Sequence, residues 1–347
     1  MIDVMTLAGS KILGIDEPEI LFGRPDLVHE RYKALARKWH PDNKDTGHNG
    51  VFTHINILHT KAKQLIENGK WNVPGELSFK TKAGKEYVLR YFKTFDFDLG
   101  KAYLSDTRIT YVIKKEFADL AENANKMIGA LKYQDKEEEK VISKYMPSIK
   151  GYYETSDEVI LMIDKPADLI RMRDLLEYSK GKIDPRHVAW MISRMLHHAS
   201  YFQWCGFSHN DLSMDTLFVC PEHHSVCVLG GWWYTTKFDE KPIALPTRTI
   251  DNAPSEFISK KLAVSGTDPE LVRLTAREIL GNGNGIHLVN DPEIPKSLTN
   301  WLRISGHGSA LEDYTQWRDK IVLDAFGKRK FRVMPISAKD VYSEKTL

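Results

Sequence analysis

Residues 206–219 read GFSHNDLSMDTLFV, and they decide the fold of the larger part of the chain. The polar group His209-Asn210-Asp211 stands between a long helical pattern and an apolar run that is typical of a strand. A second apolar run, SVCVLGGWWYTT at 225–236, follows a short polar turn. The two runs predict a hairpin whose second half carries no carboxylate.

Strand patterns precede this stretch and helical patterns surround it. Apolar or alternating runs typical of strands occupy residues 86–98, 99–105, 108–115 and 159–164. Helical patterns occupy residues 117–132, 137–146, 169–178, 185–204 and 267–281. Strands that come first and helices that follow predict an α+β arrangement.

These pieces, in this order, resemble a protein-kinase fold over about residues 86–330. The resemblance implies that YVIK at 111–114 carries the lysine that pairs with phosphate, Lys114, and that Glu138 on the next helix is its partner. It places His209-Asn210-Asp211 at the catalytic loop and Asp268 on a buried central helix. Residues 253–256, APSE, look like the A-P-E segment.

The departures from the kinase pattern bear on catalysis. Phosphoryl transfer needs groups that hold metal ions, because charge develops on the transferred phosphoryl group. One family ligand is an asparagine five residues after the catalytic aspartate, and here that position is Thr216. The other is the aspartate of D-F-G, where this chain has Leu229-Gly230-Gly231. The family's glycine-rich loop is also reduced, to Gly100 alone.

We therefore interpret this region as a pseudokinase, which is a kinase-like fold used for binding. Lys114, Glu138, Asp211, Asp215 and Thr216 outline its degenerate nucleotide pocket, with Asp215 as a conceivable unusual metal ligand and Asp211 as the catalytic residue if the domain is active. No metal and no cofactor are expected. ATP binding without magnesium is the one option left open for this pocket.

The N-terminal segment carries a different pattern. Residues 25–39 place Val28, Tyr32, Leu35 and Trp39 on one face of a helix. His40-Pro41-Asp42 follows, and a residue before proline avoids the α region, so the helix ends there. A second amphipathic pattern covers residues 49–71 and predicts an antiparallel helical hairpin.

This segment resembles a J-domain, the co-chaperone module that acts on DnaK-type chaperone ATPases. The motifs are KILGI at 11–15, YKALARKWHPDN at 32–43 and the helix containing FTHIN. The resemblance implies that the HPD loop and the basic face before it dock on the chaperone. The implied contact residues are His40, Pro41, Asp42, Arg31, Lys33, Arg37 and Lys38. A longer stretch, DEPEILFGRPD at 16–26, departs from the family pattern.

The composition argues against several other classes of protein. The chain has 347 residues with 49 basic and 47 acidic side chains, and this balance argues against bulk nucleic-acid binding. No apolar run of about 18 residues predicts a membrane span. The N-terminus lacks the pattern of a signal peptide. Three cysteines are too few for a disulfide framework, so a reducing, cytoplasmic location is expected.

The segment Cys220-Pro-Glu-His-His-Ser-Val-Cys227 also has spacings that can hold zinc. The kinase register instead places it on a hairpin, with Leu217–Val219 pairing with Val226–Val228, and this interpretation is preferred. GKRKFR at 327–332 contains four basic residues, and a solvated patch is favoured there over a nucleic-acid site.

The sequence thus predicts a J-domain at 1–72, a linker at 73–85, a kinase-like domain at 86–335 and a tail at 336–347. The small lobe covers about 86–164 and the large lobe about 165–335. The expected function is that of a co-chaperone-like protein, in which the J-domain recruits and stimulates a DnaK-type chaperone while the kinase-like domain binds an unknown client. The alternatives are a phosphotransferase that uses Lys114 and Asp211, and a module that captures the chaperone without productive turnover.

Overall fold

The computed structural model describes residues 4–68, 71, 73–306, 308–328 and 330–343. The chain divides into two compact units. The first comprises residues 1–94, 103–105 and 345–347, and the second comprises residues 95–102 and 106–344. No helix in the described part of the chain is both long enough and apolar enough to cross a membrane.

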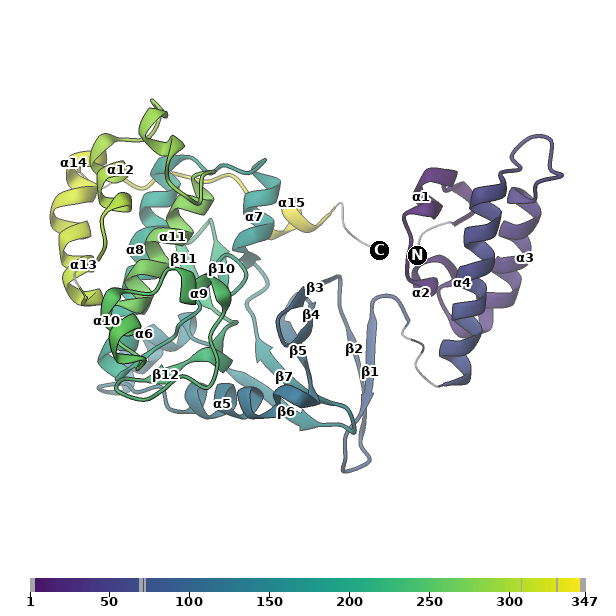
Figure 1. Ribbon diagram of the computed structural model, residues 1–347, viewed down its shortest axis with the longest axis horizontal. Helices are drawn as coiled ribbons and strands as arrows, with labels where there is room; N and C mark the ends of the chain where they lie inside the picture. Colours follow the sequence, from purple (N-terminus) through teal and green to yellow (C-terminus); the bar gives the residue numbers. More distant parts are fainter. Residues whose placement is uncertain (1–3, 69–70, 72, 307, 329, 344–347) are drawn as a thin grey trace. The chain divides into compact units, whose positions relative to one another are not determined.

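The first unit is mainly helical. Its elements are η1 (Val4–Thr6), α1 (Gly9–Leu13), α2 (Pro18–Phe22), η2 (Pro25–Leu27), α3 (Val28–Trp39), α4 (Asn49–Glu67), β1 (Glu76–Lys80) and β2 (Glu86–Arg90). Helices α3 and α4 pack side by side, as the sequence predicted (Figure 1). Helix α3 ends where expected, because His40 precedes proline and has extended backbone with ψ 135°.

The core of this unit lies between its helices. Leu35 of α3 and Ile55, Leu58 and Ala62 of α4 are buried, and they pack with Ile12 of α1. Tyr32 and Trp39 are partly buried against the same cluster. The apolar stripes read from the sequence therefore face each other in the folded unit.

The linker predicted at residues 73–85 is wrong. Strand β1 lies within it and pairs with β2 in an antiparallel hairpin whose rings Phe79 and Tyr87 stack 5.1 Å apart. This hairpin clusters with the helical unit, so the boundary lies near residue 94 and not near residue 72. The three lysines and Gly84 between residues 80 and 85 resemble a linker in composition, although this segment forms the turn of the hairpin.

A five-stranded sheet has the order β3-β4-β5-β7-β6. Its strands are β3 (Lys93–Phe97), β4 (Gly100–Leu104), β5 (Arg108–Lys114), β6 (Ile149–Glu154) and β7 (Glu158–Asp164). The predicted strand at 86–98 is therefore two strands, β2 and β3. Strands β5 and β7 pair antiparallel, and their interior residues are nearly all buried, which makes this pair the centre of the sheet.

The remaining elements of the second unit are mostly helical. They are η3 (Lys115–Phe117), α5 (Ala118–Gly129), α6 (Lys136–Ile142), η4 (Ser143–Tyr145), β8 (Ile170–Arg171), α7 (Met172–Tyr178), α8 (Pro185–Cys205), β9 (Phe207–Ser208), β10 (Leu217–Cys220), β11 (Ser225–Val228), η5 (Trp232–Tyr234), β12 (Thr236–Lys237), α9 (Thr247–Asp251), α10 (Ser255–Lys260), α11 (Thr267–Ile279), η6 (His287–Asn290), α12 (Lys296–Arg303), α13 (Ala310–Gln316), the π-turn η7 (Trp317–Ile321), α14 (Val322–Phe326) and α15 (Ala338–Tyr342).

Helix α8 organises this unit, since it contacts α11, α13, β9 and β11. Asp184 caps its N-terminus, and Gly206, with φ +91°, ends it and turns the chain into residues 207–211. The tail predicted at 336–347 is partly structured: α15 packs on α7, and the Tyr342 hydroxyl donates to Asp174 at 2.9 Å. Residues 344–347 lie outside the described residues.

Candidate functional site

The first candidate site is the loop between α3 and α4. The Asp42 side chain is 91% exposed and the His40 side chain 49% exposed. The Asp42 backbone N–H donates to His40 Nδ1 at 3.2 Å, and the His40 ring meets the edge of Phe52 of α4 at 5.0 Å. The predicted HPD residues therefore lie at the surface, and the Asp42 carboxylate lies 3.5 Å from His40 Nδ1 in the same loop.

Asn43 fixes this loop, a role that the sequence interpretation missed. Its Nδ2 donates to the carbonyl groups of Arg37 and Lys38, at 3.3 and 3.1 Å, and so caps the end of α3. Its Oδ1 accepts from the N–H groups of Asp45 and Thr46. Gly47 is also required, because a Cβ there would lie 2.4–3.0 Å from three loop carbonyl oxygens.

The four predicted basic residues of α3 do not all face solvent. Lys33 and Arg37 are exposed one helical turn apart on α3. Lys38 donates to the Met5 carbonyl, and its ammonium lies over the Trp39 ring. The Arg31 guanidinium packs against Gly23. Two of the four predicted cations therefore face solvent beside the loop, and the other two help to hold the unit together.

The second candidate site is a cavity of about 560 Å³ in the larger unit. Its walls come from β3, β5, β8, the loop 211–216, the segment 230–234 and α9. The lining residues are Phe95, Asp96, Phe97, Asp98, Tyr111, Arg171, Arg173, Asp211, Ser213, Met214, Asp215, Thr216, Gly230, Trp233, Tyr234, Pro246, Thr247, Arg248 and Glu278. Asp211, Asp215 and Thr216 line this cavity, whereas Lys114 and Glu138 do not.

Asp268 of α11 holds the loop that presents Asp211. It is buried and accepts the backbone N–H groups of His209 and Asn210 at 2.8 and 2.9 Å. Asp211 itself is half-buried at the cavity wall. Burial raises the pKa of Asp211 to about 7, although nearby Arg248 acts in the opposite direction. This carboxyl is consequently poised to change its charge near neutral pH.

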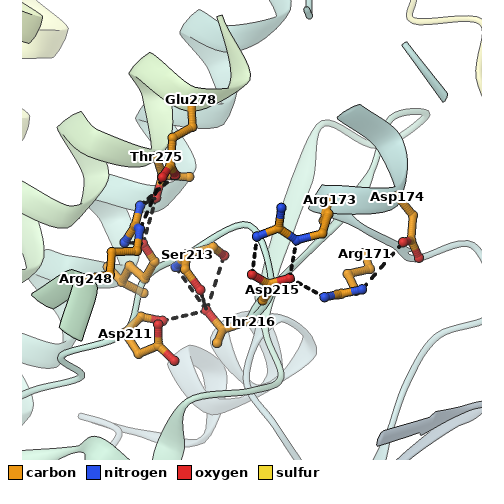
Figure 2. Close-up of polar contacts among 11 residues, drawn as sticks. Arg171, Arg173, Asp174, Asp211, Ser213, Asp215, Thr216, Arg248, Thr275 and Glu278 are labelled. Carbon is orange, nitrogen blue, oxygen red and sulfur yellow. Dashed lines mark hydrogen bonds and ion pairs between the residues drawn. The ribbon is translucent and has the colours of Figure 1, made fainter. Parts of the chain in front are cut away.

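The Thr216 side chain holds the loop 211–216 in shape through hydrogen bonds. Its hydroxyl donates to the Asp211 carbonyl at 2.5 Å and accepts the Ser213 N–H at 3.0 Å, as Figure 2 shows. A threonine side chain offers a single oxygen, and here that oxygen closes the turn. The position that the kinase pattern gives to a metal ligand therefore serves a structural role in this chain.

The space beside Gly230 is filled by an aromatic cluster. A Cβ at Gly230 would lie 2.7 Å from the Tyr111 hydroxyl. Tyr111 is 1% exposed, and its hydroxyl has no hydrogen-bond partner within the described parts of the chain. Phe97 and Trp233 pack against its ring at centroid distances of 5.3 and 5.0 Å. A side chain at position 230 would therefore require the Tyr111 hydroxyl to move.

Asp215 is paired with two arginines. Arg173 binds it through two nitrogens and Arg171 through one, all at short distances (Figure 2). Burial by itself would raise the pKa of Asp215, but the two guanidinium groups outweigh it and the pKa is lowered. The Arg171 guanidinium also lies 3.7 Å above the Phe95 ring. Asp215 is thus an anchor for β8 and α7, and no pattern in the sequence predicted this network.

The predicted pair of Lys114 and Glu138 is not formed. Side chains alternate along a strand, so Lys114 at the exposed end of β5 points to the face opposite Tyr111. The Glu138 carboxylate accepts the Gln134 N–H at the start of its own helix. Helix α5, and not α6, packs against η5, where Asn123 donates to the carbonyl groups of Trp233 and Thr235.

Comparisons with known proteins agree with the kinase-like part of this description. No family model matches the sequence, and no curated protein sequence matches it. Among solved structures, the chain is similar to one described as the structure of vaccinia related kinase 3. The TM-score is 0.50 at 13% sequence identity, over 72% of this chain and 90% of that chain. This similarity shows that the chain contains a protein kinase-like fold.

Proposed function

We propose that this chain is a co-chaperone-like binding protein. Its N-terminal unit acts as a J-domain, which recruits a DnaK-type chaperone through the HPD loop and stimulates its ATPase. Its kinase-like domain serves as the module that binds a client. The observation that carries the proposal is the exposed Asp42 carboxylate on a loop that Asn43 and Gly47 hold in one shape.

The physical chemistry of this loop suits recognition of a partner. An exposed carboxylate can accept two hydrogen bonds from one arginine, and such charge-assisted bonds are about twice as strong as those between neutral groups. A loop already fixed by side-chain hydrogen bonds loses little entropy on binding. Lys33 and Arg37, exposed on the adjacent helix, would steer the unit toward an acidic surface.

Three features of the cavity support a binding role for the kinase-like domain over a catalytic one. Tyr111 fills the space beside Gly230, Thr216 closes its own loop, and Asp215 is neutralised by Arg171 and Arg173. Without two groups to hold metal ions, the charge on a transferred phosphoryl group is left uncompensated. Loss of one comparable electrostatic element costs a factor of roughly 10³–10⁵ in rate.

The test is ATP hydrolysis by a purified DnaK-type chaperone in the presence of the full chain. The parent chain should stimulate turnover, and Asp42→Asn should abolish the stimulation because it removes the charge that a partner arginine would bind. Asp45→Asn is the matched control, since Asp45 is an exposed carboxylate in the same loop outside the tripeptide. Equal stimulation by the parent and Asp42→Asn would refute the proposal.

The same assay addresses capture of the chaperone without turnover. In that case the parent chain would bind the chaperone in a pull-down experiment, Asp42→Asn would not, and neither would stimulate hydrolysis. That outcome would keep the docking loop and reject its stimulating role.

Phosphoryl transfer is the second candidate, and Asp211 is the feature that favours it. A carboxyl at a cavity wall whose pKa is raised to about 7 suits a general base. Lys114 lies outside the cavity and has no part in this version of the hypothesis. Transfer of labelled phosphate with magnesium or manganese, lost in Asp211→Asn, would support catalysis and overturn the binding-only role.

A further inference from the structure

Three side chains of metal-binding type meet on the larger unit, away from the cavity described above. Asp168 lies in the loop between β7 and β8, Cys220 ends β10, and His223 lies in the turn that leads to β11. One ligand atom from each lies within 4.8 Å of the others. Within the described part of the chain, no other group of three histidine, cysteine or acidic side chains brings its ligand atoms this close together.

The turn that follows Cys220 keeps two of the three side chains close together in the sequence. Cys220-Pro221-Glu222-His223 places the histidine three residues after the cysteine, and Pro221 restricts the backbone between them. The Cys220 side chain is buried, whereas His223 is exposed, so the group lies at the surface.

The other two members of the sequence pattern are engaged elsewhere. The His224 ring stacks on Trp190 at 4.5 Å, and its Nε2 lies 2.9 Å from the Arg332 carbonyl. The Cys227 thiol donates to the Lys144 carbonyl at 3.7 Å. The predicted hairpin register is confirmed, with Leu217 opposite Val228 and Val219 opposite Val226. The hairpin and a metal site are therefore compatible, with Asp168 taking the place of the second cysteine.

We propose that Asp168, Cys220 and His223 bind a zinc ion through one oxygen, one sulfur and one nitrogen. Zinc accepts this mixed donor set in tetrahedral geometry, with bonds of about 2.0–2.3 Å. Magnesium and calcium prefer sites made of oxygen alone. Three protein ligands leave the fourth position for water or for a ligand group.

Small movements complete the geometry. The Cys220 thiol now donates to Asp168 Oδ2 at 2.8 Å. Two ligands of a tetrahedral zinc ion stand about 3.5 Å apart, so this pair opens by a fraction of an ångström. The thiol proton leaves to solvent as the Zn–S bond forms. Asp168 and Cys220 also line a cavity of about 350 Å³ beside residues 331–340, which gives small ligands access to the metal.

The experiment is titration of the reduced full chain with Co²⁺, followed by displacement with Zn²⁺. The parent chain should develop a sulfur-to-cobalt charge-transfer band with one equivalent of metal and lose it when zinc is added. Cys220→Ser should develop no such band. Asp168→Asn and His223→Gln should weaken binding by about tenfold or more, since even residues behind a ligand have effects of that size.

The matched controls are Cys227→Ser and His224→Gln on the same hairpin. Both should keep the band, and circular dichroism checks that every variant is folded. Zinc should also raise the melting temperature of the parent chain and leave that of Cys220→Ser unchanged. Absence of the band in the parent, or its persistence in Cys220→Ser, would overturn the proposal. Loss of the band in Cys227→Ser would overturn the assigned ligands.

Discussion

At the scale of single residues, Tyr111 and Gly230 together determine what the cavity can hold. The tyrosine hydroxyl occupies the space that a side chain at position 230 would need, only 2.7 Å from the site of its Cβ. A side chain at position 230 would therefore meet a bulky neighbour. An aspartate at position 230 would have to displace the Tyr111 hydroxyl before its carboxylate could reach the cavity.

We expect Gly230→Asp to destabilise the larger unit by about 1–3 kcal/mol, the usual cost of overpacking a filled interior. Urea unfolding measures the change. Tyr111→Phe/Gly230→Asp should recover part of the loss, because the hydroxyl in contact is removed. Tyr111→Phe alone should be neutral or stabilising, since the buried hydroxyl lacks a partner in the described structure. A Gly230→Asp variant as stable as the parent would contradict this account.

At the scale of elements, the end of α3 shows how a helix terminus shapes a docking loop. Pro41 stops the helix, and Asn43 then satisfies two of the carbonyl groups that the last turn leaves without partners. The same side chain accepts two N–H groups from the loop beyond it. One residue therefore couples the helix end to the position of Asp42.

Asn43→Ala should lower the stability of the first unit by about 1–2 kcal/mol, because four hydrogen bonds of the loop lose their common partner. Hydrogen exchange should become faster at the backbone amides of residues 43–48, and stimulation of the chaperone should fall with it. Asn49→Ala is the control, as Asn49 is exposed at the start of α4. Unchanged exchange in Asn43→Ala would show that the loop holds its shape by other means.

At the scale of the whole molecule, each unit has a hydrophobic core of its own. The core of the first unit includes Leu35, which is fully buried. The second unit contains a fully buried ion pair, in which Arg273 of α11 donates to Asp313 of α13 at 2.5 and 2.9 Å. The Arg273 guanidinium also lies 4.2 Å from the Trp301 ring. These two centres can be perturbed separately.

Leu35→Ala should cost the first unit about 2–5 kcal/mol by leaving a cavity. Asp313→Ala should cost the second unit about 3–5 kcal/mol by leaving Arg273 buried without its counter-charge. Hydrogen exchange resolved by element measures both effects, in α3 and α4 for the first variant and in α11 and α13 for the second. Each variant serves as the control for the other, and equal effects in both units would contradict the division of the chain.

The sequence by itself determined the features that depend on neighbouring residues. It located the helix stop at His40-Pro41, the two facing apolar stripes, the hairpin of β10 and β11 with its register, and the loss of carboxylates at 229–231. The spacing of apolar residues, the residues that favour turns and the residue type at each position are local properties. They can therefore be found in the sequence without knowledge of the fold.

Only the tertiary structure decided which distant residues meet. It placed Lys114 on the face opposite the cavity, brought α5 to η5 in place of α6, and joined Asp215 to Arg171 and Arg173. It also made a strand of the supposed linker and brought Asp168 to Cys220 and His223. These outcomes depend on strand pairing and on the facing of packed elements, which are set by contacts between residues far apart in the sequence.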